Sequence, residues 1–128
     1  MRKYIRILIL LISISTLLSG AIQVVAPAFV LNFVGGEIDL STKQLFATIG
    51  MFMVLFGGMM VHVLYHEENN RVAVFWSGLQ KLGASVAVFI GIYLGVFIPL
   101  AAGVAIFDLV SGLLFFYYLR TLKTNAVS

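Results

Sequence analysis

Two side chains of opposite charge lie near the middle of otherwise apolar stretches of the sequence. Lys81 lies in RVAVFWSGLQKLGASVAVFIGIYLG and Asp108 lies in IPLAAGVAIFDLVSGLLFFYYL. A charge at the depth of the bilayer centre is costly, and such residues usually pair with one another or mark a functional site. We favour a buried ion pair that fixes helix register. The alternatives are a proton or ion relay, a polar anchor for a small ligand such as a quinone, and contact with a charged helix of a partner subunit.

The two charges can meet if the stretches that carry them are consecutive antiparallel helices. At 1.5 Å per residue, Lys81 lies about 20 Å from Leu94, and Asp108 lies about 15 Å from Ile98. The link between Leu94 and Ile98 is very short, so both depths are measured from the same end of the hairpin. A difference of about 5 Å is within reach of the long lysine stem.

A second candidate for chemistry is the histidine pair His62 and His66. These residues are four apart, on one face of the expected helix, and Glu67 and Glu68 follow them. That spacing can hold a divalent metal ion. Because no third ligand is identifiable elsewhere, we interpret the pair as the solvated polar end of a helix, and we expect no metal site.

The remaining sequence offers little for catalysis. It contains no cysteine, which excludes disulfides, thiolate metal sites and cysteine nucleophiles. It also lacks a phosphate-binding glycine loop and an HExxH motif. We therefore expect neither a catalytic site nor a bound cofactor. A quinone-binding role would instead predict a lateral pocket near Asp108, walled by Phe107, Phe115 and Phe116.

The elements that must position these residues are membrane-spanning helices. The chain is 62% hydrophobic, with 8 Lys and Arg, 5 Asp and Glu, and a mean hydropathy of +1.11. Four continuously apolar runs have the roughly 20 residues that a helix needs to cross a bilayer. They cover about 4–26, 44–65, 72–94 and 98–119, with an interfacial segment at about 27–36. We predict one all-α transmembrane domain over residues 1–128, a polytopic four-helix bundle, with Ser41 as the N-cap of the second span.

Lysine and arginine predict the orientation of this bundle. One side holds six of them, Arg2, Lys3, Arg6, Arg71, Arg120 and Lys123, whereas the other holds only Lys43. The positive-inside rule places both termini in the cytoplasm, in an inner (plasma) membrane. The first run resembles a signal peptide at its start, but its apolar character continues through Val25, which favours an uncleaved anchor.

Small residues predict where helices approach each other. The third run carries Gly83, Ala87, Gly91 and Gly95 at successive i+4 positions, and the fourth carries Ala101, Ala105 and Gly112 on the face of Asp108. Such rows allow close packing of membrane helices. We favour packing inside the bundle over packing against another protein chain. Lys81 points away from Gly83, and Gln23 is expected to form an interhelical hydrogen bond.

Three segments carry a resemblance to known proteins: PAFVLNFVGG at 27–36, QKLG at 80–83 and FDLVSGLLFFYYLR at 107–120. In layout, over the whole chain, the sequence resembles small bacterial four-helix integral membrane proteins, some of them DoxX-like. For true DoxX members the resemblance implies an association with quinone-linked redox systems, but it carries over no catalytic residues.

These observations favour a non-enzymatic role, as a small accessory or interaction subunit of a membrane complex. The expected partners are the lipid bilayer and a membrane protein or a second copy. Nucleic acid is not expected, because the basic residues are scattered around helix ends. The alternatives are a proton, ion or small-solute transporter that uses Lys81 and Asp108, and a quinone- or lipid-binding redox accessory protein.

Overall fold

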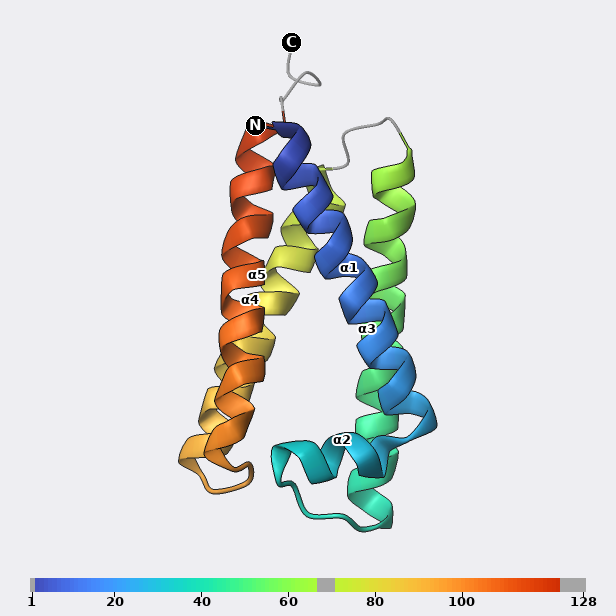
Figure 1. The fold of residues 1–128 in the computed structure, drawn as a ribbon, viewed down its shortest axis with the longest axis vertical. Helices are drawn as coiled ribbons and strands as arrows, with labels where there is room; N and C mark the ends of the chain where they lie inside the picture. The colour runs from blue at the N-terminus through green and yellow to red at the C-terminus, as the bar shows by residue number, and fades with distance from the viewer. Residues whose placement is uncertain (1, 67–70, 123–128) are drawn as a thin grey trace.

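A computed structural model describes residues 2–66 and 71–122, and this part of the chain is helical without strands. Its elements are α1 (Arg2–Val25), α2 (Pro27–Val34), α3 (Leu40–Tyr65), α4 (Arg71–Tyr93), the 3₁₀ helix η1 (Pro99–Ala101) and α5 (Ala102–Thr121) (Figure 1). Four segments are long and apolar enough to cross a membrane: Lys3–Val25, Leu40–Tyr65, Arg71–Tyr93 and Pro99–Thr121. The predictions of an all-α four-helix bundle and of a multi-pass membrane protein are therefore confirmed.

The four long helices form two pairs, α1 with α3 and α4 with α5 (Figure 1). Glycine makes the first pair close: a Cβ added to Gly20 would lie 2.7 Å from the Gly50 carbonyl oxygen, and one added to Gly57 would lie 2.7 Å from the Leu17 nitrogen. In the second pair a Cβ on Gly112 would lie 2.6 Å from Leu82. Both pairs therefore depend on small residues that let neighbouring helices approach.

The pairs are joined at the end of the bundle where α1 begins and α5 ends, which we call the terminal end (Figure 1). An apolar core gathers there from all four long helices, with Ile5, Ile9, Met60, Leu64, Ala73, Val74, Phe115, Tyr118 and Leu122 buried. Arg71, at the start of α4, donates to the carbonyl oxygens of Leu119 and Leu122 at 2.9 and 2.6 Å. A cation at these carbonyls also interacts favourably with the negative end of the helix dipole of α5.

At the opposite end, which we call the hairpin end, α2 connects the two pairs. Pro27 stands in the first turn of α2, where its missing N–H costs little, and Gly35 ends the helix with a φ of 75°. The Ile98 nitrogen then donates to the Val34 carbonyl oxygen at 2.9 Å. The predicted interfacial segment is thus a short helix that contacts the link between α4 and α5.

The start of α3 differs from the prediction. The N-cap is Asp39 rather than Ser41, because Asp39 accepts a hydrogen bond from the Thr42 backbone nitrogen at 2.8 Å. In return the Asp39 nitrogen donates to the Thr42 hydroxyl at 2.9 Å. This capping box begins the helix at Leu40, before the apolar run itself starts.

The predicted small-residue ridge on α4 is not a contact within the chain. Gly83 and Ala87 are exposed, and Gly95 lies beyond the helix with a φ of 80°. Of the four ridge residues only Gly91 is buried, against the ring of Phe97. The reason is the direction of Lys81: two residues correspond to about 200° of rotation, so burying the lysine turns Gly83 outward.

The second predicted row, which begins at the end of η1 and continues along α5, does face inward. Ala101 and Ala105 are both 0% exposed, and Gly112 is buried against α4. The helix therefore presents Asp108 from the side that packs inside the bundle.

Candidate functional site

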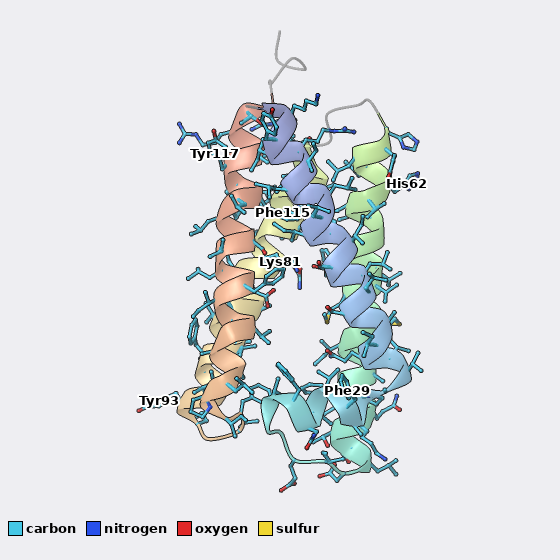
Figure 2. The ribbon with its side chains drawn as sticks, in the orientation of Figure 1. Phe29, His62, Lys81, Tyr93, Phe115 and Tyr117 are labelled. Atoms are coloured by element: carbon cyan, nitrogen blue, oxygen red, sulfur yellow. The ribbon has the colours of Figure 1, made fainter. Side chains whose placement is uncertain are left out.

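Lys81 lies on a buried stripe of α4 and points toward α1 at mid-height of the bundle (Figure 2). The stripe also contains Val74, Ser77 and Ser85, each at most 3% exposed. Because these residues recur at intervals of three and four, they share one face of the helix. This face positions the ammonium between the two helix pairs.

The structure brings the two intramembrane charges together. Lys81 Nζ lies 3.6 Å from Asp108 Oδ1, and the two side chains are only 6% and 13% exposed. The short link between α4 and α5 matches the depths of the two residues, as their positions in the sequence predict. Both charges are thus largely buried at the contact between α4 and α5.

A third helix completes the cluster. Lys81 Nζ also donates a hydrogen bond to the hydroxyl of Thr16 on α1. That hydroxyl donates its own hydrogen to the Ile12 carbonyl oxygen at 2.9 Å, which leaves its lone pairs free to accept from the ammonium. We call Thr16, Lys81 and Asp108 the polar cluster, and it connects α1, α4 and α5.

Aromatic contact adds to the surroundings of the ammonium. Lys81 Nζ lies 5.6 Å from the centroid of the Phe107 ring, within the range of a cation–π interaction. The ammonium thus faces a carboxylate, a hydroxyl and a ring, one from each of three directions in which it can donate. These contacts hold the lysine side chain in place between the helices.

Thr16 was not predicted from the sequence. Its signal is a polar stripe on the first span, Ser13, Thr16 and Gln23, spaced as residues on one helix face. Ser13 donates to the Ile9 carbonyl oxygen at 2.7 Å, and Gln23 Nε2 donates to the Phe46 carbonyl oxygen of α3 at 2.9 Å. The expected interhelical bond of Gln23 is therefore present.

One polar atom of this region has no partner. Ser77 is 3% exposed, and its hydroxyl makes no hydrogen bond in the described part of the chain. It lies one turn from Lys81 on the same face of α4. A buried hydroxyl without a partner is costly.

The candidate histidines lie apart from the polar cluster. Both are exposed at the end of α3, where His66 Nδ1 donates to the His62 carbonyl oxygen at 3.0 Å and the rings are 4.6 Å apart. Among the described residues no group of three metal-ligating side chains occurs. Glu67 and Glu68 lie outside the described residues.

The three phenylalanines near Asp108 have different surroundings. Phe115 is 1% exposed in the apolar core, whereas Phe116 packs against Phe75 with ring centroids 5.7 Å apart. Phe107 is 46% exposed beside Lys81. The three rings therefore lie in different surroundings, one in the apolar core, one against Phe75 and one beside Lys81.

Comparisons with known proteins add no assignment. No family model matches the chain, and neither the curated proteins nor the solved structures include a significant match. The resemblance in layout to DoxX-like proteins therefore stays a prediction.

Proposed function

We propose that this protein is a non-catalytic interaction subunit of a membrane complex, and that it associates through its helix faces with another membrane protein or a second copy. It would lie in an inner (plasma) membrane with both termini in the cytoplasm, which the distribution of lysine and arginine supports. Nearly all of the described chain is membrane-spanning or interfacial helix, so helix surface is what it has to offer a partner.

The observation that carries the proposal is Gly83. This residue lies within α4, is exposed, and would have no atom within 4 Å of an added Cβ. Glycine weakens a helix interior by roughly 1 kcal/mol relative to alanine, so it needs a reason. At Gly20, Gly57 and Gly112 the reason is a close helix neighbour within the chain. At Gly83 a neighbour from another chain would supply it, with Ala87 one turn along the same face.

Disulfide crosslinking in membranes tests this proposal, because the chain has no cysteine of its own. A Gly83→Cys variant, oxidised in native membranes, should form a crosslinked dimer or a crosslink to a partner that carries a cysteine at the facing position. The matched control is Leu113→Cys, since Leu113 is 58% exposed on α5. Equal crosslinking of both variants, or none at Gly83 while the control crosslinks, would contradict the proposed interface.

A further inference from the structure

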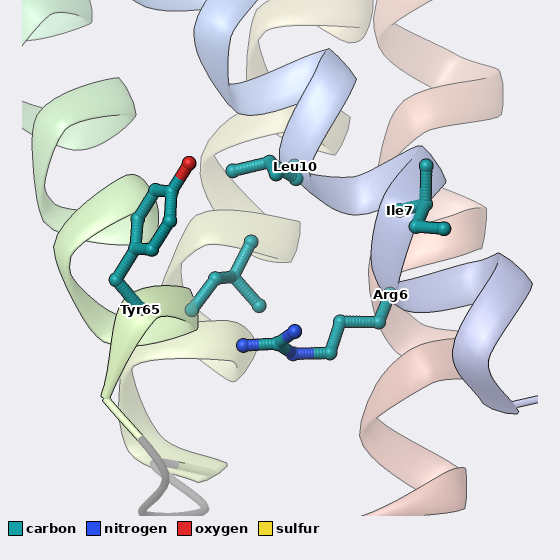
Figure 3. A pocket seen from close by; sticks show the side chains of 5 residues that line it. Arg6, Ile7, Leu10 and Tyr65 are labelled. Carbon is teal, nitrogen blue, oxygen red and sulfur yellow. The ribbon is translucent and has the colours of Figure 1, made fainter.

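A pocket of about 40 Å³ lies between α1 and α3 near the terminal end of the bundle, away from the polar cluster (Figure 3). Its lining residues are Arg6, Ile7, Leu10, Leu64 and Tyr65. Leu64 is buried in the apolar core, whereas Ile7 is 44% exposed. The pocket thus has an apolar floor and opens toward the surroundings of the protein.

Two polar groups border this floor, and each is without a partner in the described part of the chain. Neither the Arg6 guanidinium nor the Tyr65 hydroxyl has a hydrogen bond or an ion pair there. Arg71, at the same end of the bundle, provides the contrast, because its guanidinium donates to two carbonyl oxygens of the chain. Within residues 2–66 and 71–122 Arg6 has no such internal role, so we take its charge as available to a ligand.

The direction of the two helices separates these groups along the membrane normal. Side chains lean toward the N-terminus of their own helix. Since α1 begins at the terminal end and α3 finishes there, Arg6 leans toward water and Tyr65 leans toward the membrane interior. Figure 3 shows this arrangement, with the tyrosine hydroxyl beside Leu10 and the guanidinium nearer the helix ends.

This order matches a phospholipid, in which an anionic phosphate lies outermost, the glycerol esters follow, and the acyl chains lie deepest. We propose that the pocket binds an anionic glycerophospholipid. Arg6 binds the phosphate, the Tyr65 hydroxyl donates to an ester carbonyl, and one acyl chain packs on Ile7 and Leu10. At about 40 Å³ the pocket exceeds the roughly 10–15 Å³ that a cavity needs to hold one water, but it cannot enclose a headgroup. The lipid therefore lies across it, with the phosphate outside.

Native mass spectrometry of the protein released from nanodiscs tests this inference. The nanodiscs contain phosphatidylcholine with one-fifth phosphatidylglycerol, and the measurement is the ratio of the two lipids retained. The intact protein should retain phosphatidylglycerol preferentially. Arg6→Gln should lower that preference about fivefold, since a basic residue near the surface contributes about 1 kcal/mol toward an anionic lipid. Arg6→Lys should restore part of it, whereas Tyr65→Phe should lower the amount of both lipids retained and leave their ratio unchanged, because both carry the ester carbonyls.

The matched control is Arg120→Gln. Arg120 is exposed in the last turn of α5, at the same end of the bundle as Arg6, and does not line the pocket. If Arg6→Gln and Arg120→Gln lower the ratio equally, the effect is general charge attraction and the site is wrong. If inorganic phosphate at millimolar concentration displaces the retained lipid, the site binds a free anion rather than a phospholipid. An unchanged ratio in Arg6→Gln also overturns the inference. None of these outcomes depends on the crosslinking result at Gly83, so the two proposals fail separately.

Discussion

At the scale of single residues, the polar cluster places the buried charge of Lys81 beside a counter-charge and a hydrogen-bond acceptor. The ion pair between Lys81 and Asp108 has an N–O distance of 3.6 Å, and the Thr16 hydroxyl accepts from the same ammonium. Desolvating two charges costs several kcal/mol per ion, and the attraction between them offsets that cost only when the partners remain together. The pair therefore contributes more to the choice of helix arrangement than to net stability.

A double-mutant cycle measures this coupling. Lys81→Met alone leaves a buried carboxylate without a partner, and we expect it to lower the free energy of unfolding by about 3–5 kcal/mol. Asp108→Leu alone should have a similar effect. The double variant removes both charges and should recover at least half of either loss, as measured by reversible unfolding in mixed micelles. A double variant no more stable than the single variants would show that the two charges are not coupled.

The residue scale also shows what the sequence reveals about the site. The meeting of Lys81 and Asp108 follows from their depths on two helices joined by a short link, which a sequence displays directly. The participation of Thr16 does not follow, because it depends on which helix packs beside α4. That choice is a property of the folded bundle, and several small or polar residues of the first span would have been equally suitable.

At the scale of helices, glycine positions decide which faces meet. A Cβ at Gly57 would lie 2.7 Å from the Leu17 nitrogen and 2.8 Å from the Ser13 carbonyl oxygen, both backbone atoms that cannot move aside. The face of α4 at Gly83 has open space instead. Glycine rows alone do not distinguish these situations, so the sequence predicts the α4 row inside the bundle, whereas in the structure Gly83 and Ala87 are exposed and only Gly91 is buried.

Alanine substitution separates the two kinds of glycine. Gly57→Ala should push α1 and α3 apart and lower the free energy of unfolding by about 1–3 kcal/mol. Gly83→Ala is the matched control and should leave the stability of the single chain unchanged or slightly raised, because alanine favours the helix. Reversible unfolding of the protein in detergent, under conditions that keep it monomeric, makes this comparison. Equal losses at both positions would contradict the packing described for α1 and α3.

The capping residue Asp39 makes the stability of the first turn of α3 depend on pH. The Thr42 backbone N–H donates to the Asp39 carboxylate and lowers its pKa below the ordinary value of 3.8. A carboxyl group with a lowered pKa stabilises the folded helix end above pH 3.8, and this contribution disappears as the pH falls through the lowered pKa. Asp39→Ala should therefore raise amide hydrogen exchange in the first turn of α3 about fivefold at neutral pH.

The control for the cap is Asp39→Asn, which keeps an accepting oxygen without a titrating group. Its first turn should remain protected, and that protection should not change as the pH falls from 6 through the lowered pKa of Asp39, whereas the protection of the unmodified chain should fall. If the first-turn amides of the asparagine variant lose protection from hydrogen exchange as the pH falls, in the same way as the unmodified chain, a group other than Asp39 is responsible.

At the scale of the whole molecule, the bundle is two close helix pairs connected at both ends. The apolar core and Arg71 join them at the terminal end, α2 joins them at the hairpin end, and the polar cluster connects them between. Composition and run length alone predict the four spans, because a helix must satisfy its backbone and show an apolar surface to lipid. The pairing of α1 with α3 was not predicted, since no short loop forces it.

The pairing of α1 with α3 also has a consequence for biogenesis. During synthesis α1 is inserted before α3. Until α3 follows, the Gln23 amide lacks the Phe46 carbonyl oxygen to which it donates in the folded protein. The Thr16 hydroxyl, which donates to Ile12 within α1, gains its second partner only when α4 brings Lys81. Each newly inserted helix thus supplies the partner that an earlier one lacked, and α5 brings the last counter-charge. Assembly of the polar cluster is for this reason coupled to completion of synthesis, and a truncated chain would expose its unsatisfied groups to membrane quality control.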